Sequence, residues 1–150
     1  MIEIKTERLY LRSNCSVVDG KFTYSFPEQP VNIFDLRSTD KMEASNSGFL
    51  IFLHSGELVG SIDIKFTRLP YELGIGTKEG YRCKHYMSEA MAACIKWIFD
   101  NCSTDTINGI DGHITHEAAV KLLTRNHFKE VRKDYWVLDR ATYLQYCSES

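Results

Sequence analysis

The stretch YRCKHYMSEAM, residues 81 to 91, combines residue types that bind phosphate. Arg82 and Lys84 carry positive charge and His85 adds a hydrogen-bond donor, just before a segment with helical periodicity. The N-terminus of a helix presents unpaired N–H groups and the positive end of its dipole, so a loop that leads into one can bind phosphate through its backbone. This loop has no glycine, which would admit positive φ and close approach of a ligand. The residues alone therefore predict either a weakened phosphate loop or a solvated basic turn.

The elements that must position this loop are predicted by their hydrophobic patterns. Two β-rich runs, 49–54 and 58–66, are joined in the manner of a hairpin, and YELGIG, residues 71–76, adds a strand before the loop. Apolar residues at three- and four-residue spacing predict an amphipathic helix over 88–101. The loop is therefore expected to connect a strand to a helix.

The rest of the chain adds further elements in sequence order. We predict a strand over 4–12 and then an irregular segment over 13–47 with one short helix near 31–37. After the amphipathic helix come a strand over 106–114, a helix over 116–125 and a last strand or hairpin over 128–143. Asn126 is expected to end the second of these helices in the left-handed conformation. With both long helices as crossovers between strands, this order predicts a mixed α/β sheet. A chain of 150 residues is expected to form one domain, residues 1–150, around one core.

Charge and composition narrow the classes of function. The net charge of -2 and the lack of a basic run give no support for a nucleic-acid partner. The longest apolar run, residues 48–53, is far shorter than the ~20 residues of a membrane span, and no signal peptide opens the chain, so no membrane partner and a cytoplasmic location are expected.

The cysteines and histidines do not form a metal-ligand pattern. The 5 cysteines include no C-x-x-C pair, which fits free thiols better than disulfides or a zinc site. His113 and His116 straddle a predicted strand end and helix start, which favours a surface pair over a metal site. No metal is expected.

The opening TERLYLR, residues 6–12, resembles the T-E-R-L-x-L-R start of the GNAT superfamily of acyl-CoA N-acyltransferases, in the branch of the ribosomal-protein N-terminal acetyltransferases. That branch continues with a strand like residues 58–64, an E-I-G strand, a Q/R-x-x-G-x-G/A loop and an E-A pair in the next helix. Residues 72–74, Arg82 and residues 89–90 fall at the same spacing. The resemblance covers most of the chain and implies the GNAT fold, a mixed, mostly antiparallel twisted sheet with crossover helices.

The sequence also departs from the family pattern. Small or catalytic residues of the pattern are replaced by Cys83, His85 and Met87 in the loop, by His116, Ala119 and His127 around the second helix, and by Leu123 in place of a tyrosine acid. Residues with a Cβ adopt left-handed conformations at a cost of about 1–2 kcal/mol. The resemblance implies that most of the loop uses conformations open to other residues, so we expect the losses to weaken the phosphate site rather than abolish it.

The resemblance implies an N-acetyltransferase that moves an acetyl group directly from acetyl-CoA, as co-substrate, to a primary amine. The amine is that of a protein N-terminus, a lysine or a small molecule. The expected cofactor-binding residues are Leu73, Gly74, Ile75, Arg82, Cys83, Lys84, His85, Tyr86 and Met87. Glu72 is the expected base, or else a surface carboxylate. The acid is His116, His127 or Tyr86, unless the thiolate leaves unaided.

Two other classes of function stay open. A catalytically silent GNAT-like domain that binds a protein or ligand would tolerate the altered loop and the missing tyrosine. A self-associating module would use the strand YWVL, residues 135–138, which could pair across a homodimer.

Overall fold

The computed structural model describes residues 1–23, 42–66, 70–109 and 117–149. Within them the elements follow in the order β1 (Ile2–Lys5), β2 (Leu9–Ser13), β3 (Ser16–Val18), β4 (Lys21–Thr23), β5 (Gly48–Leu53), β6 (Leu58–Lys65), β7 (Tyr71–Thr77), α2 (Tyr86–Asn101), β8 (Thr106–Gly109), α3 (Glu117–Arg125), β9 (Lys129–Arg132), β10 (Tyr135–Asp139) and α4 (Arg140–Glu149). The short helix predicted near 31–37 and the second half of the strand predicted over 106–114 lie outside the described residues.

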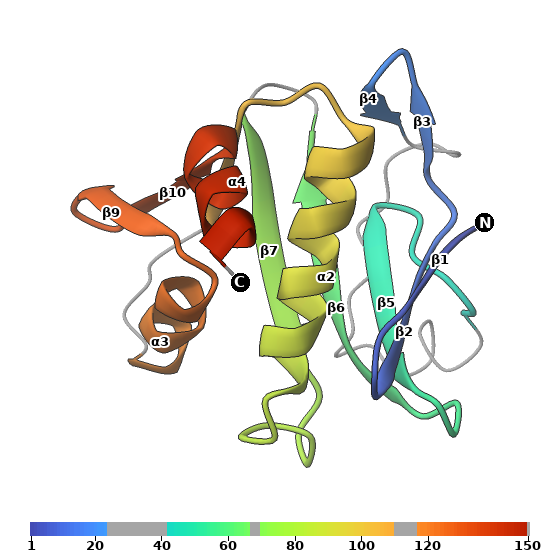
Figure 1. The fold of residues 1–150 in the computed structure, drawn as a ribbon. Coiled ribbons are helices and arrows are strands. Elements are labelled where there is room, and N and C mark those ends of the chain that lie inside the picture. The colour runs from blue at the N-terminus through green and yellow to red at the C-terminus, as the bar shows by residue number, and fades with distance from the viewer. Residues whose placement is uncertain (24–41, 67–69, 110–116, 150) are drawn as a thin grey trace.

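One sheet organises these elements (Figure 1). Its strand order is β1-β2-β5-β6-β7-β8-β10-β9, and β3 pairs with β4 as a separate hairpin. Every neighbouring pair in the larger sheet is antiparallel except β7 and β8, which run parallel. The predicted mixed, mostly antiparallel sheet is therefore confirmed.

Helix α2 covers one face of the sheet because its apolar residues recur every three or four positions. Its buried side chains are Ala90, Met91, Cys94, Ile95, Ile98 and Phe99. They share one core with buried side chains of the sheet such as Leu11, Ile62 and Leu73. Leu122 and Leu123 of α3 join the same core. A Cβ on Gly109 of β8 would lie 2.4 Å from Leu123, so only glycine lets α3 pack this closely. The helices thus share one face of the sheet.

The N-terminal region differs from its prediction in two places. The strand expected over 4–12 is broken into β1 and β2 by a tight turn, in which the Thr6 N–H donates to the Leu9 carbonyl at 2.8 Å. The irregular segment contains the β3–β4 hairpin, whose turn residues Asp19 and Gly20 both have positive φ. An Asp-Gly pair between β-rich residues is a strong hairpin signal, which the prediction of an irregular segment overlooked.

The C-terminal region differs as well. Residues 140–149 form α4 instead of continuing the last strand. The prediction that Asn126 ends α3 in the left-handed conformation is wrong. The next residue, His127, adopts that conformation instead, with φ 69°. Strand β10 has β8 on one side and β9 on the other, so both of its edges are occupied and it cannot pair with a second copy as expected.

None of the described helices combines the length and the apolar character that a membrane crossing requires.

Candidate active site

Strand β7 lies at the centre of the candidate site because part of one edge has no strand partner. It pairs with β6 along its length, from Glu72 to Thr77. On the other side it pairs with β8 through Tyr71 with Ile107 and Glu72 with Asn108. Among the described residues, no strand is paired to this side of β7 from Leu73 onward. Backbone groups of an unpaired strand edge can bind an extended ligand as though it were a further strand.

The loop over 78–85 leads from this edge into α2 (Figure 1). His85 is the N-cap residue of α2, and no side chain caps the helix there. Cys83 and His85 have φ values of 64° and 62°, in the left-handed region. Cys83 and His85 therefore have the backbone conformation that glycine favours, while the other residues of 82–87 have no positive φ, in line with the expectation that most of the loop uses conformations open to other residues.

Two cations of the loop, Arg82 and Lys84, precede the N-terminus of α2, and α3 adds Arg125. Arg82, Lys84 and His85 are exposed, and Arg82 Nε donates to the Thr77 carbonyl at 3.4 Å. Arg125, in the last turn of α3, places its Nη1 2.7 Å from Nδ1 of His85. No sequence signal pointed to Arg125, because 40 residues separate it from its partner. The positive charge and the helix dipole together favour an anion at this point.

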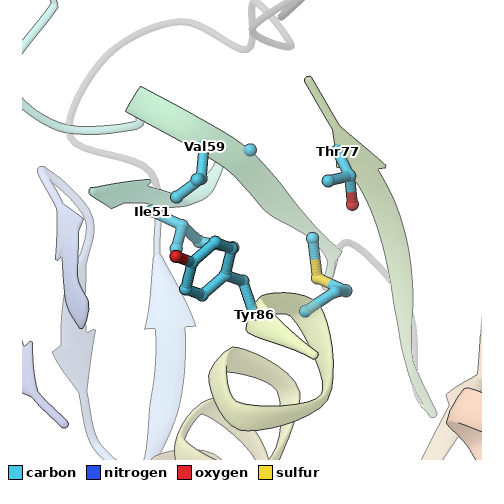
Figure 2. Close-up of a pocket in the computed structure, with 6 residues that line it drawn as sticks. Ile51, Val59, Thr77 and Tyr86 are labelled. Carbon is cyan, nitrogen blue, oxygen red and sulfur yellow. The ribbon is translucent and has the colours of Figure 1, made fainter. Parts of the chain in front are cut away.

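The first two residues of α2 are bulky, and their side chains point toward the core. Tyr86 and Met87 are half-buried and pack against the core. With Ile51, Val59, Gly60 and Thr77 they close a depression too narrow to admit a water molecule (Figure 2). Tyr86 extends toward Ile51 and Val59 in this view. The Met87 side chain therefore packs between helix and sheet and does not block the outer side of the loop.

The opposite face of the sheet is polar near β7. Tyr71 and Leu73 belong to the core, so alternation along the strand turns Glu72 to the other face. By the same alternation Asp63, between the core residues Ile62 and Ile64, shares that face.

Asp63 is a second carboxylate that the sequence did not single out. It pairs across the strands with Gly74, where a Cβ would meet only Asp63 itself, at 3.8 Å. Burial raises the pKa of Asp63 to about 6, against the opposing effects of a hydrogen bond from Ser47 and the charge of Lys65. A carboxylate kept half-buried beside a glycine is a group that functional sites often contain.

Asn108 lies directly across from Glu72 in the parallel register. Its Nδ2 donates to the Tyr135 hydroxyl at 2.9 Å, while its Oδ1 is buried and accepts no hydrogen bond from any described residue. An unpartnered buried acceptor is unfavourable by about 1–3 kcal/mol, so it indicates a place for a donor from a ligand or water. Sequence patterns could not reveal it, since the partner strands meet only in the fold.

The predicted acids occupy different places. His116 lies outside the described residues. His127 stacks on Tyr146 of α4, with ring centroids 3.8 Å apart. Tyr86 lies under the guanidinium of Arg8, 4.5 Å from its ring centre. Leu123 is fully buried, so α3 presents no acid at that position. Glu72 thus lies near the start of β7, whereas the predicted loop residues, with Tyr86 among them, lie at the start of α2, beyond the other end of that strand. His127 lies away from both, at the end of α3.

Several solved structures share this fold. An acetyltransferase (GNAT family) from Bacillus anthracis matches with TM-score 0.64 and 20% identity, over 92% of this chain and 98% of that chain. A ribosomal-protein-S5-alanine acetyltransferase from Vibrio fischeri matches with TM-score 0.60 and 14% identity, over 91% and 94%. Spermidine N-acetyltransferase from Vibrio cholerae, in complex with CoA and spermine, matches with TM-score 0.56 and 14% identity, over 78% and 81%. No curated protein matches the chain.

These matches show that the mostly antiparallel sheet of this chain has the fold of known acetyltransferases. The model of the acetyltransferase (GNAT) family matches residues 12–128. The chain therefore belongs to the GNAT family, as its sequence predicted.

Proposed function

We propose that the protein transfers an acetyl group from acetyl-CoA to a primary amine. The observation that carries this proposal is the backbone of the loop. Cys83 and His85 retain left-handed conformations in front of the uncapped N-terminus of α2, beside the unpaired edge of β7. A backbone that keeps a strained conformation without glycine is most readily explained by a function that needs that conformation.

Acetyl-CoA fits the residues present. Its pyrophosphate would lie on the N–H groups of Cys83, Lys84, His85, Tyr86 and Met87, with Arg82 and Arg125 adding charge. Its pantetheine arm would lie along the backbone of Leu73, Gly74 and Ile75, at the unpaired edge of β7.

The chemistry requires a nitrogen–carbon bond to form while the carbon–sulfur bond of the thioester breaks. Glu72 would take the proton that the ammonium group must lose, directly or through water. Oδ1 of Asn108, beside it, would accept an N–H of the substrate. The thiolate would then leave with a proton from His116, His127 or Tyr86, or unprotonated, since thiols are tolerable leaving groups near neutral pH.

The acceptor is proposed to be a cation. Glu72 and Asp63 place two carboxylates on the face of the sheet opposite α2, which favours an ammonium group there. Names of structural neighbours mention spermidine and the alanine of ribosomal protein S5. A protein N-terminus, a lysine and a small polyamine are therefore the amines to test first.

We further propose that residues 1–150 act as one acyltransferase domain. None of the 5 cysteines, all within the described residues, forms a disulfide, and Cys83 and Cys147 are exposed, which favours a reducing compartment such as the cytoplasm. A homodimer stays a prediction, without β10 as its contact.

Calorimetric titration with acetyl-CoA tests the proposal first. We expect micromolar binding, about -8 kcal/mol, by the wild-type protein. Arg82→Ala should weaken it, whereas Arg132→Ala, at an exposed position on β9, should not. Release of CoA thiol is then measured with an N-terminal alanine peptide, a lysine peptide and spermidine, and Glu72→Gln should slow it.

Absence of binding at millimolar acetyl-CoA would overturn the proposal and leave the catalytically silent binding domain as the function to pursue. Binding without thiol release to any amine would favour the same alternative.

A further inference from the structure

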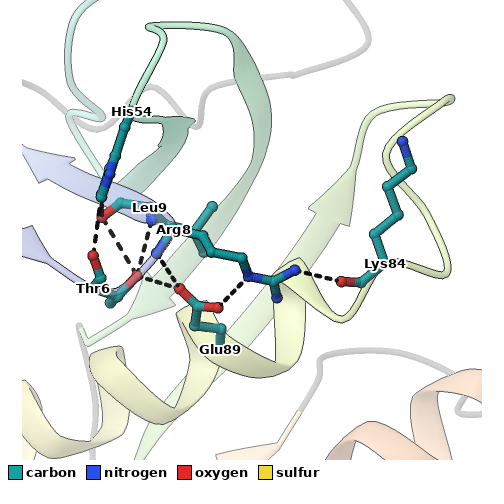
Figure 3. A network of polar contacts seen from close by, with 6 residues as sticks. All are labelled: Thr6, Arg8, Leu9, His54, Lys84 and Glu89. Carbon is teal, nitrogen blue, oxygen red and sulfur yellow. Dashed lines mark hydrogen bonds and ion pairs between the residues drawn. The ribbon is translucent and has the colours of Figure 1, made fainter.

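The turn between β1 and β2 lies against the start of α2 (Figure 3). Glu89, in the first turn of α2, accepts hydrogen bonds from the Thr6 hydroxyl at 2.5 Å, the Arg8 N–H at 3.0 Å and Arg8 Nε at 2.7 Å. Burial would raise the pKa of Glu89, but the hydrogen bonds from Thr6 and Arg8 outweigh it and hold that pKa below its ordinary value. Glu89 is therefore an ionised anchor at neutral pH.

Arg8 extends this contact to the loop. Its Nη1 donates to the Lys84 carbonyl at 3.1 Å, and its guanidinium covers the ring of Tyr86. Lys84 lies between Cys83 and His85, the two left-handed residues. One side chain, fixed by Glu89, thus holds the carbonyl at the middle of the strained segment.

The charge of Arg8 is already matched by Glu89, at 2.7 Å. A neutralised pair adds little long-range attraction for an anion. The planar fork of the guanidinium, which binds Glu89 and Lys84 at the same time, is a geometric device that lysine does not reproduce. The arrangement therefore suits a role in holding the backbone more than a role in attracting phosphate.

We propose that Arg8 is a positioning residue for acetyl-CoA, one that holds loop 82–85 in the left-handed form that receives the pyrophosphate. This inference rests on the proposed function. Cys83 and His85 each adopt that form at a cost of about 1–2 kcal/mol, so an untethered loop would spend more time in other conformations. Acetyl-CoA would then bind only the fraction of molecules whose loop is in the left-handed form, and the apparent affinity would fall in proportion to that fraction. The tether compensates for the missing glycines.

The test compares two thioesters on the full chain. Acetyl-CoA carries the pyrophosphate and acetyl-pantetheine lacks it. Arg8→Ala and Arg8→Lys should weaken acetyl-CoA binding at least tenfold and change acetyl-pantetheine binding less than twofold. The matched control is Arg12→Ala, which removes a similar ion pair, 2.8 Å long, between Arg12 of β2 and Glu3 of β1, away from the loop. It should leave both affinities within twofold.

Hydrogen exchange on the free protein tests the tether without any ligand. The amides of residues 82–85 should exchange faster in both Arg8 variants than in wild type and Arg12→Ala. If Arg8→Ala does not fold, Glu89→Gln, which removes the charge that fixes Arg8, takes its place with the same expectations.

Four results would overturn the inference. They are equal losses for both thioesters, full affinity in Arg8→Lys, a loss in Arg12→Ala as large as in Arg8→Ala, and unchanged exchange of the loop. Wild-type protein that binds no acetyl-CoA would instead overturn the proposed function, while the exchange data would still decide whether Arg8 orders the loop.

Discussion

Cys83, His85 and His127 share an uncommon backbone conformation, with φ between 62° and 69°. Cys83 and His85 lie just before α2, and His127 lies just after α3. At His85 and His127 the family pattern has glycine. Each such residue makes the folded state less stable than glycine would, so other contacts must hold it, such as the bond from Arg125 to His85 and the stacking of His127 on Tyr146.

Cys83→Gly should therefore raise the free energy of unfolding by about 1 kcal/mol, because relief of the left-handed strain exceeds the added freedom of glycine in the unfolded chain. Urea unfolding with an unchanged slope measures it. Gly80→Ala is the control of opposite sign and should lower the free energy of unfolding. Gly80 has φ 92°, and a Cβ there would touch nothing, so the substitution adds backbone strain without changing any contact. A loss of stability in Cys83→Gly would show that the thiol makes a contact worth more than the strain.

Helix α2 is held at both ends by arginines from distant parts of the chain. Arg8 and Glu89 fix its first turn. At its other end Arg140, the first residue of α4, donates to the carbonyls of Phe99 at 2.5 Å, Cys102 at 2.8 Å and Thr104 at 2.8 Å. The last carbonyls of a helix have no partner within it, and the guanidinium binds one of them, that of Phe99, together with the carbonyls of Cys102 at the C-cap and Thr104 beyond it. The position of the candidate phosphate site thus depends on both ends.

Arg140→Met should lower the free energy of unfolding by about 3 kcal/mol, since three charge-assisted hydrogen bonds are lost and partly buried carbonyls stay unsatisfied. Exchange of the amides in the last turn of α2 should increase before global unfolding. Arg132→Met is the matched control, because that exposed arginine only covers the ring of Tyr135, at 4.4 Å, and should change stability by less than about 1 kcal/mol. Equal effects of the two substitutions would show that Arg140 does not anchor the helix.

In the whole molecule, the parts that sequence predicted are those with local patterns. The β5–β6 hairpin and α2 follow from alternation and helical spacing within a single segment, and the loop residues followed from their fixed distance to Glu72 and Glu89. Arg8 and Arg125 were missed because their partners lie 81 and 40 residues away. Asp63 and Asn108 were missed because the positions that make them notable belong to neighbouring strands.

The stability of the whole molecule should depend on pH through Asp63. Its folded pKa, about 6, lies above the ordinary value of 3.8, so the folded state disfavours the carboxylate, and this cost grows as pH rises from 3.8 to about 6. Asp63→Asn should therefore be more stable than wild type above about pH 6, by about 2 to 3 kcal/mol, and nearly equal to it below pH 3.8.

Thermal unfolding across this pH range measures the difference. Asp100→Asn is the control, since it removes an exposed pair with Lys96 and should lower the free energy of unfolding only slightly at neutral pH. A constant difference between Asp63→Asn and wild type at all pH values would contradict the assignment.

The short parallel contact between β7 and β8 has a consequence for how the two strands are held apart. Both residues of β7 that pair with β8 do so at its start, whereas all four residues of β8 pair with β10. The spacing of β7 and β8 is therefore set chiefly by the core side chains beneath them, such as Leu73 and Ile107. Substitutions that change the volume of those side chains should therefore alter the separation of β7 and β8, and with it the unpaired edge along which we propose that the pantetheine arm lies.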